Sequence, residues 1–196
     1  FTNEDLSAFL FDVRKDSLYC DRPDAARRRA YRTLLAILFE ALAKWLAPIL
    51  VFTAEEAWEQ RHGEAAGSIH FETYAAIDPA WRDEELEAAM ETVLALRGDA
   101  FEVLEGLRRD KTVGSFLQAA LQVRVADPAD LAILGGHDLA EMLIVASVRL
   151  EAGPAEGRWA ISAARTEDAR CDRCWRHLPD VAGETGLCTR CAEAVV

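Results

Sequence analysis

Two Cys-x-x-Cys pairs near the C-terminal end constrain the fold of this chain more than any other feature. The first pair is Cys171 and Cys174, and the second is Cys188 and Cys191. A loop of 13 residues containing proline and glycine separates the two pairs. Two tight turns of this kind supply the four soft ligands that zinc takes in a tetrahedral structural site. The spacing therefore predicts one structural zinc ion held by these four cysteines, in a module whose folding energy comes mainly from the metal.

Redox activity is the alternative interpretation of the two pairs. A thioredoxin-like site needs one such pair beside a βαβ unit rather than two pairs close together, so the pattern favours metal. The chain has no hydrophobic run of membrane-spanning length and no signal peptide, which predicts a cytoplasmic protein. In that reducing compartment, paired cysteines bind metal more often than they form disulfides. The fifth cysteine, Cys20, stands alone and is interpreted as a small buried hydrophobe.

The first 110 residues are dominated by helical periodicity. Apolar residues at steps of three and four predict a long helix over 23–45, with Asp21 as a candidate cap, and a second one over 81–109. A short helix is expected to end near Gly63. Since the chain begins at Phe1 and its first apolar positions already follow helical spacing, we expect a fragment cut from a longer protein.

After residue 110 the periodicity changes to that of strands. Alternation in "LQVRVAD", "MLIVASVRL" and "RWAISAAR" predicts three strands, with a short helix starting at Pro128 between the first two. The expected fold is thus mainly α: a helical bundle over 1–110 with its N-terminal part cut, a small α+β unit over 111–166, and a zinc-ribbon-like tail with four cysteine ligands over 167–196.

Basic and aromatic side chains surround the predicted zinc ligands. The net charge of −12 argues against nucleic acid, but the acidic excess is concentrated in the helical middle of the chain. Arg173 and Arg176 flank an aromatic residue, Trp175, and this combination is typical of RNA binding by phosphate contacts and base stacking. Two alternatives stay open: the arginines compensate the charge of the thiolates, and Trp175 packs over the zinc module.

A second basic group lies at the start of the first long helix. Helical geometry points Arg28, Arg29 and Arg32 to the flank and the solvent side of that helix. They are candidate RNA contacts, and a solvated face is the alternative. The sequence presents no pair of carboxylates, Ser/His/Asp set or Gly-rich phosphate loop, so no catalytic residue is assigned.

Several stretches together resemble one enzyme family. "DVRKDSLYCDRPDAARRRAYRTLL", "LAKWLAPILVFTAEEAWE" and "IHFETYA" are similar to the anticodon-binding helical domain of class I aminoacyl-tRNA synthetases of the Ile/Val/Leu group. "RRDKTVGSFLQAALQV" and the terminal "RCDRCWRHL…GLCTRC" resemble the bacterial-type isoleucyl-tRNA synthetases. The resemblance covers essentially the whole chain. One departure is "VGSFLQA", where the family more often has a second serine.

The resemblance implies a role for the chain within a larger ligase. The family activates isoleucine with ATP, using Mg²⁺, and transfers it to tRNA(Ile); this part is expected to dock the anticodon stem and loop. The signatures HIGH and KMSKS and an editing domain are absent, so the fragment alone is expected to be inactive. The implied partner is tRNA(Ile) rather than DNA or a membrane, and the implied state is a monomer.

Two functions of other classes compete with this interpretation. The tail also resembles the zinc finger of formamidopyrimidine-type DNA glycosylases, but those repair enzymes need an N-terminal proline nucleophile and a helix-turn-helix, which Phe1 and the long helices do not match. The other alternative is a protein-interaction module in which zinc only stabilises the end of the chain. Salt-sensitive binding of tRNA would argue against such a module.

Overall fold

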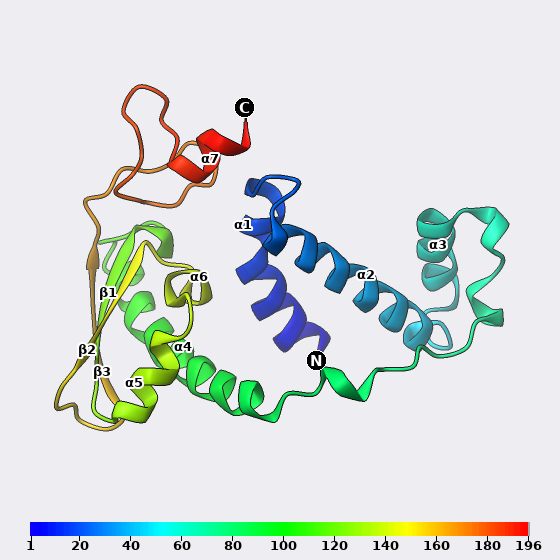
Figure 1. The fold of residues 1–196 in the computed structure, drawn as a ribbon, viewed down its shortest axis with the longest axis horizontal. Helices are drawn as coiled ribbons and strands as arrows, with labels where there is room; N and C mark the ends of the chain where they lie inside the picture. The colour runs from blue at the N-terminus through cyan, green and yellow to red at the C-terminus, as the bar shows by residue number, and fades with distance from the viewer. Residues whose placement is uncertain (196) are drawn as a thin grey trace. The chain divides into compact units, whose positions relative to one another are not determined.

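A computed structural model describes residues 1–195, and helices dominate it (Figure 1). The described residues form two compact units. The smaller is continuous, Pro23–Arg82, and the larger combines Phe1–Arg22 with residues 83–195. The division into three parts at residues 110 and 166 stays a prediction.

The larger unit contains a sheet whose central strand is β1. Strand β1 (Ala119–Val125) pairs in parallel with β2 (Ser147–Ala152) and antiparallel with β3 (Trp159–Arg165). Leu121, Val123 and Val125 are buried while the residues between them face outward, as the alternation predicted. The predicted first and third strands are confirmed.

The predicted strand "MLIVASVRL" is wrong in its first half. Residues Leu139–Leu143 form a short helix, α6, and strand β2 begins only at Ser147. Asp138 caps this helix, because its carboxylate accepts a 3.0 Å hydrogen bond from the backbone N–H of Glu141. Ile144 ends the helix in the left-handed conformation (φ 56°). A local cap and turn thus override the apolar run.

Helix α4 (Glu84–Arg109) lies against the sheet. Asp83 caps it by accepting a 2.9 Å hydrogen bond from the N–H of Leu86, and its first turn is acidic, which suits the helix dipole. Val93 and Leu96 pack with the sheet residues Val123 and Val125 in one core cluster. The predicted helix is confirmed from residue 84, whereas Pro79–Trp81 forms a separate 3₁₀ turn, η4.

Short helices complete the larger unit. They are the π-helical segment η1 (Thr2–Phe11), helix α1 (Asp12–Cys20), the 3₁₀ turn η5 (Phe116–Gln118), helix α5 (Pro128–Gly135) and helix α7 (Thr189–Ala194). The cysteine-rich segment follows β3 and ends in α7, as the orange and red ribbon of Figure 1 shows.

The smaller unit is built on two helices. They are α2 (Ala26–Leu46) and α3 (Val51–His62), followed by the 3₁₀ turns η2 (Glu64–Ala66), η3 (Ile69–Phe71) and η4. Its core consists of Ala47, Ala54, Trp58 and Ile69. In residues 1–195, no helix combines the length and the apolar character that crossing a bilayer requires.

Candidate metal centre and the surface around it

The structure brings the four cysteines of the two pairs together. Their Sγ atoms all lie within 4.8 Å of one another, and all four side chains are buried. The sulfur atoms of Cys174 and Cys188 are 3.9 Å apart. The donor set is therefore four thiols from two tight turns, which is the set that structural zinc sites use.

Backbone geometry holds the two arms of this metal module, residues 170–194, in place. The N–H of Trp175 donates to the carbonyl oxygen of Cys171 at 2.9 Å, and Trp175 itself is left-handed (φ 64°), which closes the first turn. The N–H of Asp172 donates to the carbonyl oxygen of Gly186 at 2.8 Å. Gly186 is also left-handed (φ 65°), and a Cβ at this position would collide with the carboxylate of Asp172. Glycine therefore suits this left-handed position where the arms meet, since any side chain there would displace the Asp172 carboxylate.

The electrostatics of the four thiols fit a divalent cation. Burial raises the pKa of Cys174 and of Cys188, and the neighbouring sulfurs raise it further. Burial also opposes ionisation of Cys171, but backbone N–H groups of Cys174 and Cys188 point at its sulfur and lower its pKa from 9.0 to about 6. Four buried thiolates cannot coexist without a compensating charge, and a zinc ion held by these cysteines would supply it.

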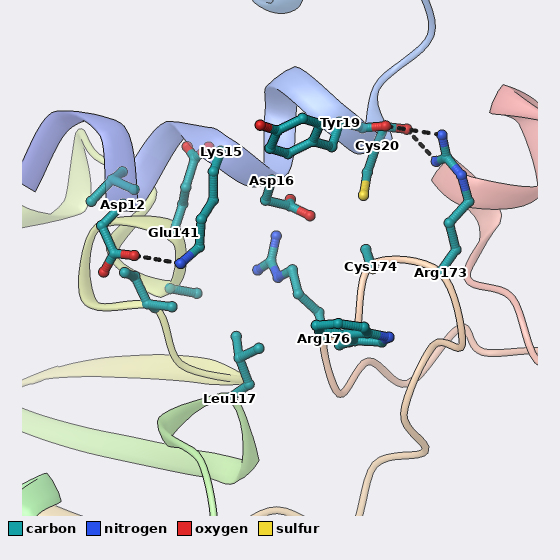
Figure 2. Close-up of a pocket in the computed structure, with 14 residues that line it drawn as sticks. Asp12, Lys15, Asp16, Tyr19, Cys20, Leu117, Glu141, Arg173, Cys174 and Arg176 are labelled. Carbon is teal, nitrogen blue, oxygen red and sulfur yellow. Dashed lines mark hydrogen bonds and ion pairs between the residues drawn. The ribbon is translucent and has the colours of Figure 1, made fainter. Parts of the chain in front are cut away.

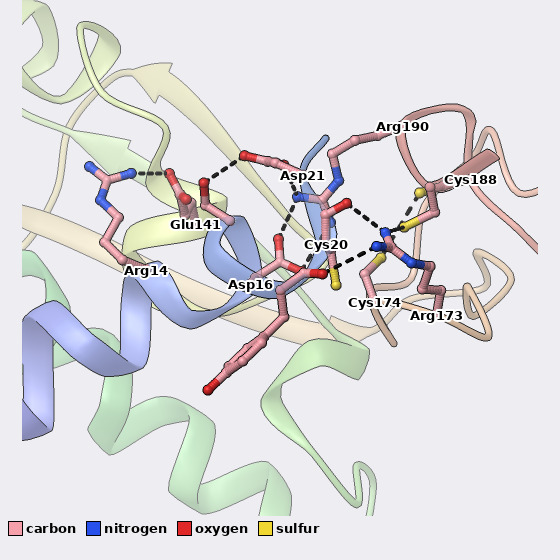
Figure 3. Close-up of polar contacts among 12 residues, drawn as sticks. Arg14, Asp16, Cys20, Asp21, Glu141, Arg173, Cys174, Cys188 and Arg190 are labelled. Carbon is pink, nitrogen blue, oxygen red and sulfur yellow. Dashed lines mark hydrogen bonds and ion pairs between the residues drawn. The ribbon is translucent and has the colours of Figure 1, made fainter. Parts of the chain in front are cut away.

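Arg190 joins the metal module to helix α1 (Figure 3). Its guanidinium makes two hydrogen bonds to the carboxylate of Asp16, at 2.6 and 3.0 Å, and one to Asp21 at 3.1 Å. Asp21 accepts a further 2.5 Å hydrogen bond from the hydroxyl of Ser17. The interpretation of Asp21 as a cap of the next helix is therefore wrong: Ala25 precedes α2, and no side chain caps it.

Arg173 makes a second connection to α1. It donates to the carbonyl oxygens of Cys20 (2.5 Å) and Tyr19 (3.1 Å), and to the Sγ of Cys191 (3.6 Å). Cys20 is buried against the cysteine cluster, as predicted for a small hydrophobe. Burial, followed by the charge of Asp16, raises the pKa of its thiol to about 11.

A cavity of about 290 Å³ lies between α1 and the metal module (Figure 2). Its walls include Tyr19 and Trp175, which are 71% and 63% exposed and so offer their rings to solvent. Arg176 extends toward α1 in Figure 2, and within residues 1–195 its guanidinium makes no hydrogen bond or ion pair. An exposed aromatic ring beside a cation that makes no hydrogen bond can take a base and a phosphate.

The other basic group lies in the smaller unit. Arg28, Arg29 and Arg32 belong to α2, where Arg29 and Arg32 are exposed and Arg28 is half-buried. The six predicted RNA contacts thus fall into a trio on the metal module and a trio on α2. Sequence analysis missed the acceptors on α1, because nothing in the local pattern of residues 16–21 indicates contact with a segment so distant along the chain.

Comparison with known proteins identifies both parts of the chain. Residues 1–124 match the family described as "Anticodon-binding domain of tRNA ligase", and residues 170–194 match the family "Zinc finger found in FPG and IleRS". The isoleucine–tRNA ligase of Zymomonas mobilis is 44% identical over all of this chain and 21% of that protein. Those of Gluconobacter oxydans and Agrobacterium fabrum are 42% and 40% identical, over 100% and 94% of this chain and 20% of each relative. The chain spans about a fifth of the length of these relatives.

Proposed function

The chain belongs to the family of anticodon-binding domains of tRNA ligases, and we propose that it is the part of an isoleucine–tRNA ligase that docks the anticodon stem and loop of tRNA(Ile). The family match over residues 1–124 carries this conclusion. The match over 170–194 supports the isoleucine class, since the relatives with that name align across both parts. The DNA glycosylase alternative accounts for the zinc finger alone.

The metal in this proposal is one structural zinc ion bound by Cys171, Cys174, Cys188 and Cys191. All four ligand positions are filled by protein sulfur, so the ion has no open position for a water molecule. Its role is therefore structural and not catalytic. Its effect is to fix the turn that carries Trp175 and Arg176. ATP and Mg²⁺ belong to a catalytic part of the longer ligase, outside this chain.

The proposed RNA contacts come from two separate basic groups. On the metal module, Trp175 stacks on an unpaired base and Arg176 contacts phosphate, while Arg173 contributes to the same surface. On α2, phosphate contacts come from Arg28, Arg29 and Arg32. Phosphate contacts place the tRNA and base contacts select it, so the energy gained here presents the acceptor end to the distant active site.

The whole protein in this proposal is a cytoplasmic, monomeric ligase that uses no DNA partner. It activates isoleucine and transfers it to tRNA(Ile), as the names of its relatives indicate for them. The acidic helical middle of the chain suits this arrangement if it faces away from the RNA, because like charges repel phosphate.

Binding to tRNA(Ile) by the zinc-loaded chain tests the proposal. Affinity is measured for tRNA(Ile) and for the same tRNA with a substituted anticodon, each at two salt concentrations. We expect tighter binding to the native anticodon and a marked loss of affinity at high salt, because counterions are released from the phosphates. Equal affinity for both tRNAs would reduce the role to electrostatic docking. No binding by zinc-loaded chain would favour a protein-interaction module.

A further inference from the structure

Each Cys-x-x-Cys pair carries an arginine immediately before its second cysteine, and both arginines reach the same helix. The sequences are Cys-Asp-Arg-Cys and Cys-Thr-Arg-Cys, with Arg173 and Arg190 at the equivalent positions. We propose that these arginines couple the metal centre to the C-terminal end of α1, and that Arg173 is a positioning residue which makes the order of that end depend on bound metal.

The bonds of Arg173 lead from a metal ligand to a helix end. The last carbonyls of an α-helix have no partner within the helix. Arg173 donates to two of them, those of Tyr19 and Cys20, and its positive charge suits the negative end of the helix dipole. The same guanidinium nitrogen that bonds to Cys20 also donates to the sulfur of Cys191. Any displacement of Cys191 is therefore transmitted to these carbonyls.

Arg190 supplies the second connection, through side chains. It bridges Asp16 and Asp21, which belong to the last turn of α1 and to the residue after it, and its side chain is 27% exposed. One zinc ion with four thiolates would carry a charge of −2, and Arg190 places a positive charge between these sulfurs and the two carboxylates.

The coupling determines the shape of the cavity beside it. Tyr19 on α1 and Trp175 on the metal module both line this cavity, and the arginine bonds set the separation between the two elements. Removal of metal frees Cys191 and the turn that bears Arg173, and thereby releases Tyr19. The proposed RNA contacts on this module consequently include Tyr19. Arg173 positions Tyr19 through its hydrogen bonds to α1 and to Cys191, without contacting RNA itself. This last step rests on the proposed function, whereas the coupling itself does not.

Hydrogen exchange of the 196-residue chain tests the coupling without RNA. The backbone amides of residues 16–21 are followed in zinc-loaded protein, in chelated protein, and in the zinc-loaded variants Arg173→Met and Arg176→Met. We expect exchange in this segment to rise at least about tenfold on chelation and in Arg173→Met. The control Arg176→Met should leave it unchanged, because that guanidinium has no hydrogen-bond partner among the described residues.

Zinc content decides how the Arg173 variants are interpreted. If Arg173→Met loses zinc, Arg173→Lys replaces it, because lysine keeps the charge but cannot bond as a fork to both carbonyls and the sulfur. Faster exchange with zinc retained supports the proposal. Unchanged exchange in a zinc-loaded Arg173 variant, or in the chelated protein, overturns it.

The salt dependence of tRNA binding then separates positioning from direct contact. Removing one phosphate interaction flattens the slope of log affinity against log salt by about 0.7 to 0.9. We expect this flattening for Arg176→Met, while Arg173→Met lowers the affinity and keeps the slope. An equal flattening in both variants makes Arg173 a phosphate contact and overturns its positioning role. If no variant binds tRNA, the proposed function fails, and hydrogen exchange still decides the coupling.

Discussion

The guanidinium of Arg190 donates to the carboxylate of Asp21 across 3.1 Å, although 169 positions separate the two residues in the chain. Asp21 ends α1 and Arg190 lies in α7, so this bond joins the beginning of the chain to its metal module. The module has no apolar core of its own besides the cysteines and a few neighbours among the described residues. We therefore expect its stability to depend on these long-range bonds and on a bound metal ion.

Replacing two zinc ligands should unfold the module alone. For Cys174→Ser with Cys188→Ser, we expect loss of bound zinc and faster proteolysis after residue 166, because the remaining pair cannot complete a tetrahedral site. The helical circular dichroism should stay close to that of the parent, since the long helices lie outside the module. Cys20→Ser is the matched control. Full zinc content in the double variant would contradict the ligand assignment.

Removal of the Trp175 ring should weaken tRNA binding without loss of metal. Stacking of one base contributes about 1 to 3 kcal/mol, which corresponds to roughly 5- to 150-fold in affinity for Trp175→Ala. Trp81→Ala is the comparison, because that ring is similarly exposed, at 57%, but belongs to η4. Equal affinity of Trp175→Ala and the parent would leave Trp175 with a packing role.

The basic group of α2 should contribute charge rather than selectivity. Arg28→Ala with Arg32→Ala is expected to lower affinity for tRNA(Ile) and for the anticodon-substituted tRNA by the same factor. The salt slope should flatten by about 0.7 to 0.9 for each phosphate that the variant no longer neutralises. Arg61→Ala with Arg109→Ala, which replaces exposed arginines of α3 and α4, is the control with the same change in net charge. An unaltered slope would indicate a solvated face.

Zinc affinity should increase with pH. The pKa values of Cys174 and Cys188 are raised by burial first and by neighbouring sulfurs second, so these thiols hold their protons at neutral pH until metal displaces them. Lowering the pH therefore weakens binding, and binding releases protons. Competition with a chromophoric chelator measures the affinity, and calorimetry in buffers of different ionisation enthalpy counts the protons. A pH-independent affinity would exclude proton-linked thiolate ligation.

The ion pair between Asp130 and Arg158 should stabilise the larger unit fully at any pH above the ordinary pKa of a carboxylate. Hydrogen bonds of 2.6 and 2.7 Å from Arg158 lower the pKa of Asp130, so the stabilisation is present at neutral pH and is lost as the pH falls through that lowered value. Arg158 is 45% exposed, and solvent screens the pair. We expect Asp130→Asn to lower the free energy of unfolding by about 1 kcal/mol. Urea denaturation across pH should show the difference vanish in acid.

Much of this architecture follows from local signals in the sequence. The repeat of apolar residues predicts α2 and α4, and alternation predicts β1 and β3, because those patterns match the period of each element. The four cysteines are equally evident from spacing. Helix α6 was missed because the cap at Asp138 outweighs the apolar run that follows it.

The sequence does not predict the bond of Asp21 to Arg190 or the bonds of Arg173 to the carbonyl oxygens of α1. Both depend on partners that the fold brings together from opposite ends of the chain. A carboxylate before a helix predicts a cap, and an arginine beside zinc ligands predicts an exposed cation. Only the tertiary structure places α1 against the metal module and gives both side chains other partners.

The larger unit is interrupted in sequence, and this affects the order in which the parts of the protein can fold during synthesis. The continuous segment Pro23–Arg82 emerges from the ribosome complete and can fold at once. Helix α1 emerges earlier, but the arginine that holds its final carbonyls is translated 153 residues after Cys20. At a synthesis rate of about 5 to 20 residues per second, the end of α1 waits on the order of ten seconds or more for its partners. The segment that carries the four cysteines, made well after α1, thus completes the structure of that helix end.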